Sequence, residues 1–213
     1  MKNIFFAVSL LSALAANAQT KISGFKFPLA STKNIPANEA VATFAEGCFW
    51  HSELVFQSLV GVRDAISGYA GGTDTNPTYE KVASGKTGHA EAVEVHYDPT
   101  KISYETLVKA FFASQDPTTL NRQGNDVGTE YRSIAFYRNS TEKQIIESEI
   151  KRLTDTKAYR KPIVTEIKPM QKFYAAEKYH QEYIQYNPDN GYVSNVSIPD
   201  FLEFKQNFKG NFK

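Results

Sequence analysis

The sequence predicts a layered α+β or α/β domain in which helices cover a β-sheet and long loops carry function. The chain has 213 residues, 41% hydrophobic and 22% charged, which is enough for one domain with a sizeable core. From Val41 onward, strand-like runs alternate with helix-like segments, and no internal repeat is present. The segments 70–89 and 115–130 are too long to be simple connections, so we expect them to be functional loops.

The first 18 residues have the layout of a secretory signal peptide. Lys2 supplies a positive start, an apolar run follows at 4–14, and Ala16-Asn17-Ala18 offers a cleavage site. The alternative is a buried N-terminal helix. We expect cleavage near Ala18 and an exported protein, either periplasmic or secreted, with no stable membrane association. Residues 19–40 are polar and are expected to form a flexible lead-in to a single domain at 41–213.

Residues of β-type, several of them alternating apolar with polar, predict strands at 41–45, 62–69, 90–97, 132–138 and 163–167. Within 90–97, the apolar Val93, Val95 and Tyr97 alternate with polar residues, and we group Glu91 with the latter. This pattern is typical of a strand with one buried face.

Apolar residues at helical spacing, together with capping and stop signals, predict helices at 48–59, 103–114, 141–154, 173–186 and 201–208. Ser103 is the expected N-cap of the second of these helices, and Asn187-Pro188 ends the fourth.

Charge and residue counts exclude several classes of site. A formal net charge of +1 gives no reason to expect nucleic-acid binding. One Cys rules out an internal disulfide and a multi-cysteine metal centre, and the four His show no His-x-x-x-His pair, so we predict no metal.

Cys48 is the first candidate for chemistry. It follows Gly47 where a predicted strand gives way to a helix, so its sulfur should lie near a helix N-terminus, which favours the thiolate. A single Cys can instead be a small buried residue, but an unpaired thiol in an exported chain calls for a reason. Phe49 and Trp50 follow directly and could form the wall of an apolar pocket or simply belong to the core.

A series of motifs in this chain resembles the A-type peptide methionine sulfoxide reductases. The motifs span roughly residues 41–192 and are Gly47-Cys48-Phe49-Trp50, Gly68-Tyr69-Ala70-Gly71-Gly72, Gly88-His89-Ala90-Glu91, Asn121-Arg122-Gln123-Gly124-Asn125-Asp126, Tyr131-Arg132-Ser133 and Tyr179-His180-Gln181. Many blocks in the same order make the resemblance specific. It implies a two-layer, ferredoxin-like α+β sandwich whose single domain at 41–213 is catalytic.

The resemblance also implies an activity, the reduction of methionine (S)-sulfoxide, free or in proteins, to methionine. Cys48 matches the nucleophile, which becomes a sulfenic acid, and Glu91 matches the acid that protonates the departing oxygen. Tyr79 and Tyr131 match donors to that oxygen. Substrate contacts are implied for Phe49, Trp50 and Asp126. No cofactor is implied, and we expect a monomer with a site at the ends of strands 41–45 and 90–97.

This chain departs from the family pattern in three places. His51 stands where Gly is common, and we expect it to point outward without effect on the thiol. Glu130 replaces a common Gln, and no second Cys follows the Asn187-Pro188 segment, although many relatives carry a resolving Cys there. An external thiol, such as thioredoxin or a small dithiol, must therefore return the sulfenic acid to the thiol.

Two other functions remain open at this level. Cys48 could act with His89 or His180 in a cysteine hydrolase, which requires an imidazole within hydrogen-bond reach of the sulfur. Alternatively, the chain could be a non-catalytic domain that dimerises through a Cys48 disulfide. Dithiol-dependent reduction of a methionine sulfoxide peptide, compared between the wild type and Cys48→Ser, separates these possibilities.

Overall fold

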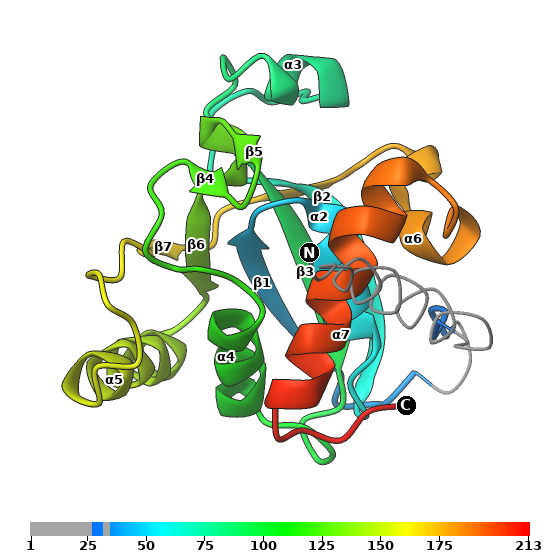
Figure 1. Cartoon of the computed structure of the whole chain (residues 1–213). Coiled ribbons are helices and arrows are strands. Elements are labelled where there is room, and N and C mark those ends of the chain that lie inside the picture. The colour runs from blue at the N-terminus through cyan, green and yellow to red at the C-terminus, as the bar shows by residue number, and fades with distance from the viewer. Residues whose placement is uncertain (1–26, 32–34) are drawn as a thin grey trace, which may run out of the picture.

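A computed structural model describes residues 27–31 and 35–213, and Figure 1 shows helices packed on a curled sheet. The predicted signal peptide at 1–18 lies outside the described residues. The sheet has six strands in the order β7-β6-β1-β3-β2-β8. They are β1 (Ala40–Glu46), β2 (Val62–Ala70), β3 (Ala90–Tyr97), β6 (Ser133–Tyr137), β7 (Glu166–Pro169) and β8 (Phe173–Ala175). Neighbours are antiparallel except for the parallel pair β6 and β7.

Four longer helices form the second layer: α2 (Phe49–Gln57), α4 (Tyr104–Ala113), α5 (Ser140–Asp155) and α7 (Ile198–Asn207). In Figure 1, α7 passes in front of the sheet and α4 lies beside the lower end of β1. The main hydrophobic core lies between the helices and the sheet, and a smaller cluster around Ile134 and Phe136 covers the opposite face. The predicted two-layer α+β sandwich is confirmed.

Shorter elements occupy the long loops. They are α3 (Tyr79–Ala83), the hairpin of β4 (Arg122–Gln123) and β5 (Asp126–Val127), the 3-10 turn η1 (Thr129–Tyr131), η2 (Lys178–His180), α6 (Tyr183–Tyr186) and the π-turn η3 (Val193–Ser197).

The register of β1 against β3 decides which side chains meet the helices. Phe44 lies opposite Val93, and the Phe44 ring stacks at 5.1 Å on Phe56 of α2. Because side chains alternate along a strand, Glu46 and Glu91, each two residues beyond this pair, also face the helical layer. The grouping of Glu91 with the polar face of its strand was therefore wrong: Glu91 has the parity of Val93.

Most predicted elements are confirmed within a few residues, but the helix predicted over 173–186 is wrong. Residues 173–175 form the edge strand β8, which hydrogen-bonds to β2, and only the short turns η2 and α6 follow. Glu177 holds the turn, because its carboxylate accepts hydrogen bonds from the Tyr69 hydroxyl at 2.8 Å and the Tyr79 N–H at 3.0 Å. Pairing with the open edge of β2 outweighs the local helical pattern.

Two other elements have bounds that differ from the predicted ones. The strand expected at 163–167 is found at Glu166–Pro169, where β7 runs parallel to β6. The last helix begins at Ile198, earlier than the predicted residue 201, because η3 leads directly into it.

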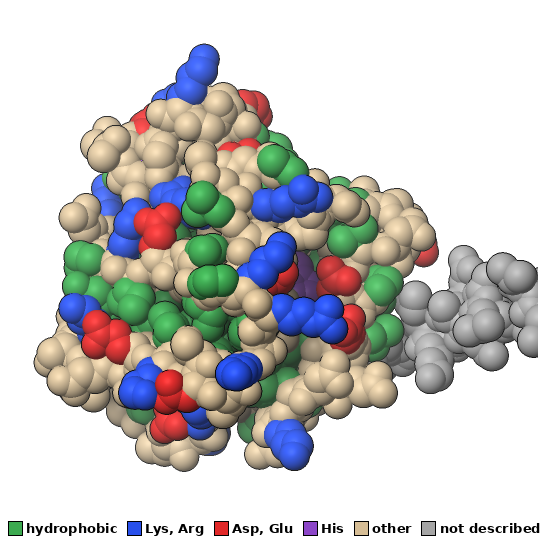
Figure 2. Space-filling view, turned by 60° about the vertical axis from the view of Figure 1, so that its left-hand side comes forward, with side chains coloured by type: hydrophobic (Ala, Val, Ile, Leu, Met, Phe, Trp, Pro, Cys, Tyr) green, Lys and Arg blue, Asp and Glu red, His purple; other side chains and the backbone are tan. Residues whose placement is uncertain are grey.

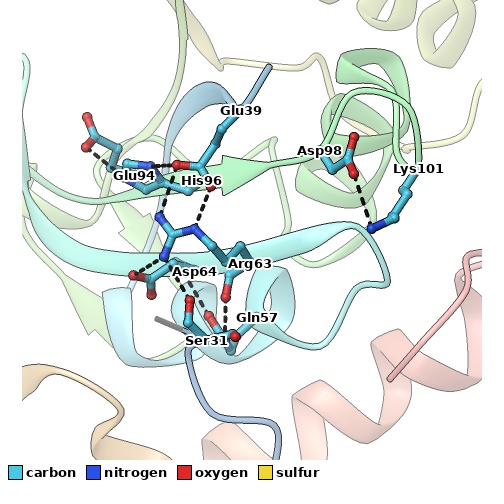
Figure 3. A network of polar contacts seen from close by, with 10 residues as sticks. Ser31, Glu39, Gln57, Arg63, Asp64, Glu94, His96, Asp98 and Lys101 are labelled. Atoms are coloured by element: carbon cyan, nitrogen blue, oxygen red, sulfur yellow. Dashed lines mark hydrogen bonds and ion pairs between the residues drawn. The ribbon is translucent and has the colours of Figure 1, made fainter. Parts of the chain in front are cut away.

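A polar network ties the lead-in to the sheet at the end away from Cys48 (Figure 3). Arg63 forms an ion pair with Glu39 at 2.5 Å and donates a hydrogen bond to the Ser31 carbonyl at 3.0 Å. His96 lies between Glu39 and Glu94, at 3.2 Å from each carboxylate.

Figure 2 shows the face turned toward α5, on which basic and acidic side chains are interspersed with hydrophobic ones. Within 27–31 and 35–213, no helix has both the length and the apolar composition that a membrane crossing requires.

Candidate active site

Cys48 lies at the junction from β1 to α2, as predicted. The turn depends on Gly47, whose φ of +105° is rarely adopted by other residues. A Cβ atom on Gly47 would also lie 2.6 Å from the Cβ of Gln123 in the β4–β5 hairpin. Glycine therefore lets the hairpin approach the start of α2, where Cys48 occupies the N-cap position.

A cavity of about 180 Å³ opens beside Cys48, and we call it the aromatic pocket. It brings together all seven of the predicted site residues and one more. Its lining residues are Cys48, Phe49, Trp50, Tyr79, Glu91, Asp126, Tyr131 and Tyr192. These residues come from the β1–α2 junction, α2, α3, β3, the β4–β5 hairpin, η1 and the segment before α7, so the fold assembles the pocket from most of the chain.

Glu91 is the buried acid of this pocket. Its side chain is 3% exposed, and its Oε2 accepts a hydrogen bond from the Phe49 N–H at 3.0 Å. Burial, with the negative charges of Asp126 and Glu130 adding to it, raises the pKa of Glu91 to about 8, whereas the Phe49 N–H opposes this shift. Glu91 is therefore mostly protonated at neutral pH, as a proton donor has to be.

The thiol of Cys48 differs from the prediction. Burial raises its pKa, and the charges of Glu91 and Asp126 raise it further. The backbone N–H groups of Trp50 and His51 at the start of α2 act in the opposite direction but do not compensate. The expected resting thiolate is therefore wrong. The resting site contains a neutral thiol beside a neutral carboxylic acid.

Aromatic side chains form the walls of the pocket. The Phe49 ring packs against Trp50 at 6.4 Å and Tyr79 at 6.4 Å. Trp50 stacks on Tyr183 at 3.8 Å, and its indole N–H donates to His180 Nδ1 at 3.1 Å. These contacts fix the rings in place, so the pocket is formed without a ligand.

Two phenols face the pocket beside Cys48. Burial raises the pKa of Tyr79 to about 12 and also raises that of Tyr131. Both phenols therefore stay protonated and can donate hydrogen bonds.

Sequence reasoning missed Tyr192 and Glu177. Tyr192 lines the pocket, and its hydroxyl donates a 2.5 Å hydrogen bond to Asp126. Glu177 orients α3 and thereby Tyr79, through the Tyr79 N–H. Tyr192 lies just after Asn187-Pro188, in the segment where many relatives carry a resolving Cys, so this part of the family pattern was the available signal.

His51 points inward, contrary to expectation. Its Nε2 lies 3.3 Å from the Ser114 carbonyl oxygen at the end of α4. Burial lowers the pKa of this imidazole, so it is neutral and does not provide the positive charge that would favour a Cys48 thiolate.

The geometry does not favour a hydrolase. His89 Nδ1 accepts from the Gly72 N–H at 3.1 Å, and its Nε2 lies 2.8 Å from the Asp74 carbonyl. His180 accepts from Trp50, so both imidazoles have structural partners. Among the residues that the structure describes, no imidazole is hydrogen-bonded to the Cys48 sulfur, and no group of three or more His, Cys, Asp or Glu is placed to hold a metal ion.

Comparison with known proteins agrees with this geometry. The family model described as peptide methionine sulfoxide reductase matches residues 40–211. The chain is 46% identical to MsrA 1 of Rhodopirellula baltica over 189 residues, covering 89% of this chain and 97% of that protein. It is 48% identical to MsrA of Pasteurella multocida, covering 81% and 98%.

Solved structures give the same result. Reduced Mxr1 of Saccharomyces cerevisiae has a TM-score of 0.68 at 34% identity, covering 76% of this chain and 93% of that one. Mxr1 in complex with Trx2 has a TM-score of 0.50 at 26% identity, covering 73% and 92%. With a buried acid and a single thiol meeting in one aromatic pocket, and with these matches over most of its length, this chain belongs to the peptide methionine sulfoxide reductase family.

Proposed function

We propose that this enzyme reduces methionine (S)-sulfoxide, protein-bound or free, with Cys48 as nucleophile and Glu91 as proton donor. One observation carries the assignment: Cys48 and a carboxylic acid with a pKa of about 8 line the same small aromatic pocket. A sulfoxide oxygen leaves sulfur readily only when it is protonated, and Glu91 holds a proton at neutral pH.

The first half-reaction transfers one oxygen atom. Glu91 gives its proton to the sulfoxide oxygen as the Cys48 sulfur attacks the sulfoxide sulfur. The proton of the thiol returns to Glu91, the oxygen ends on Cys48 as a sulfenic acid, and methionine is released. Attack by a thiol near a neutral acid creates less charge in the pocket than two ionised groups would, which agrees with the burial of Glu91.

The remaining residues orient the substrate. The hydroxyls of Tyr79 and Tyr131 donate to the oxygen as negative charge develops on it. Phe49 and Trp50 pack against the methyl group and the side-chain stem, which need an apolar surface. Asp126, held by Tyr192, faces the pocket and orients the polar part of the substrate.

Recycling requires an external thiol because Cys48 is the only Cys in the sequence. A thioredoxin-like protein or a small dithiol attacks the sulfenic acid sulfur, water leaves, and a second thiol releases Cys48. The solved complex of yeast Mxr1 with Trx2 supports a thioredoxin-like reductant for this chain.

The test measures methionine formed from a methionine sulfoxide peptide with and without dithiothreitol. We expect one equivalent per enzyme without the dithiol, full turnover with it, and neither with Cys48→Ser. Mass spectrometry after the single turnover should show Cys48 plus one oxygen atom. An unmodified Cys48 after methionine has formed would refute the sulfenic acid intermediate.

We further propose that the enzyme acts outside the cytoplasm as a monomer with one catalytic domain at 41–213. The positive, apolar and small-residue order of residues 1–18 supports export, in the periplasm or in secreted form. N-terminal sequencing of protein from the exported fraction should begin at Gln19, whereas an intact N-terminus would contradict the proposal.

A further inference from the structure

A second cavity, of about 330 Å³, reaches Cys48 from a different side, and we call it the acidic cavity. It lies among the end of α4, the β4–β5 hairpin, η3 and α7. It shares only Cys48, Asp126 and Tyr192 with the aromatic pocket. Cys48 is therefore the one reactive group common to both cavities.

The inner part of the acidic cavity contains buried polar atoms without partners. Glu46 is 2% exposed and Ser197 is 1% exposed, yet none of the described residues offers a hydrogen bond to Glu46 Oε1 or Ser197 Oγ. The side-chain amide nitrogen and oxygen of Gln115 are also buried and have no hydrogen-bond partner among the described residues. Buried polar atoms are normally paired, so this cluster indicates a site for a polar ligand.

The outer part is negatively charged. Asp116, Asp200 and Glu203 line the cavity and are exposed, whereas none of its lining residues among those described is Lys or Arg. His51, the one basic side chain in the lining, is partly buried and has a lowered pKa. A ligand with a positive group gains from this field, and an anionic ligand is repelled.

The stereochemistry of recycling connects this cavity to the reaction. Thiol attack on a sulfenic acid requires the incoming sulfur to approach opposite the S–O bond that breaks. Under the proposed function, that oxygen lies in the aromatic pocket near Glu91. A thiol that approaches through the aromatic pocket would collide with this oxygen. A thiol that approaches through the acidic cavity would not, so the acidic cavity is the better route to the Cys48 sulfur.

We propose that the acidic cavity binds the reducing thiol and selects a small aminothiol over an anionic thiol. The ammonium group lies against the carboxylates of Asp200 and Glu203, and the hydroxyl of Ser197 and the amide of Gln115 bind the polar part. The incoming thiolate sulfur bonds to Cys48, the S–O bond breaks, and Glu91 protonates the leaving oxygen to give water and then regains a proton from solvent. A second thiol then attacks the mixed disulfide, which returns Cys48 as the thiol and releases the disulfide of the reductant.

The test separates recycling from sulfoxide reduction, on which this inference rests. Full-length reduced enzyme first reacts with a methionine sulfoxide peptide without thiol, and the methionine burst counts the active sites. The oxidised enzyme is then mixed with cysteamine, 2-mercaptoethanol or 2-mercaptoethanesulfonate at equal thiolate concentrations, and the rate of sulfenic acid loss is measured per active site.

We expect cysteamine to react roughly tenfold faster than the sulfonate, with 2-mercaptoethanol between them, as a field of several carboxylates predicts. The ratio should fall to about threefold in the Asp200→Asn/Glu203→Gln double variant and remain unchanged in the control Glu147→Gln, whose side chain is exposed on α5. Ala113→Phe, which fills the cavity from its rim, should slow recycling by all three thiols at least about tenfold, because the incoming sulfur no longer reaches the position for attack on Cys48.

The outcomes are distinct. No methionine burst in the wild type refutes the proposed function. If the burst is normal but the rate of sulfenic acid loss is the same for all three thiols and does not change in Ala113→Phe, the assignment of the acidic cavity is overturned.

Discussion

Replacing Glu91 with Gln tests the proton donor directly. The side chains have the same shape, and the Gln carbonyl oxygen can still accept from the Phe49 N–H, so the pocket should stay intact. With a pKa of about 8, Glu91 is about nine-tenths protonated at pH 7. A carboxyl group with its usual pKa would be protonated in about one molecule in several hundred, so burial increases the reactive fraction on the order of 10²-fold.

We therefore expect Glu91→Gln to slow the single-turnover formation of methionine by roughly 10²-fold or more, the usual loss for a general acid. In the wild type, the rate should fall as the pH rises through about 8, because Glu91 loses its proton there, and this fall should be absent from the variant. The assay is quenched-flow measurement of methionine without added thiol.

Glu94→Gln is the matched control. It lies on the same strand, three residues from Glu91, and its carboxylate instead pairs with His96 and Arg138. It should keep the wild-type rate and pH profile. An undiminished rate in Glu91→Gln, or a wild-type rate that keeps rising above pH 8, would refute the role of Glu91.

Three further changes test the site and the fold. Tyr131→Phe removes one donor to the sulfoxide oxygen and should lower the single-turnover rate about tenfold without changing the melting temperature, and an unchanged rate removes Tyr131 from the mechanism. Gly47→Ala forces an L-residue to φ +105° and a contact with Gln123, so chemical denaturation should show a loss of roughly 1–3 kcal/mol, which wild-type stability would contradict. Hydrogen bonds of His96, first to Glu94, raise the imidazole pKa above its ordinary 6.5. The protonated imidazole therefore stabilises the folded state; this contribution is complete below pH 6.5 and is lost as the pH rises through the folded-state pKa. His96→Gln should flatten that part of the profile of unfolding free energy against pH, and an identical slope would show that His96 does not contribute.

Local patterns were sufficient for much of the fold. The strand at 90–97 follows from alternating apolar residues, and its buried face follows from Val93 and Val95. The position of Cys48 between a strand and a helix follows from Gly47, because few other residues can make that turn. The resemblance named all seven predicted residues of the aromatic pocket, and the fold brings them together.

Long-range contacts decided the elements that were predicted wrongly. Residues 173–175 have a helical pattern, but the open edge of β2 offers them backbone hydrogen bonds that a local pattern cannot reveal. The side chain of His51 turns inward because the Ser114 carbonyl at the end of α4 lies within reach.

The protonation states of Cys48 and Glu91 show most clearly what the sequence could predict and what only the tertiary structure decides. From the sequence, the start of a helix predicts an ionised Cys48, because that effect depends on neighbouring backbone groups. How far a charge is removed from water depends on every segment that covers it, and here those segments come from distant parts of the chain. Only the tertiary structure could therefore decide that the thiol rests in its neutral form and that a second, acidic cavity meets it.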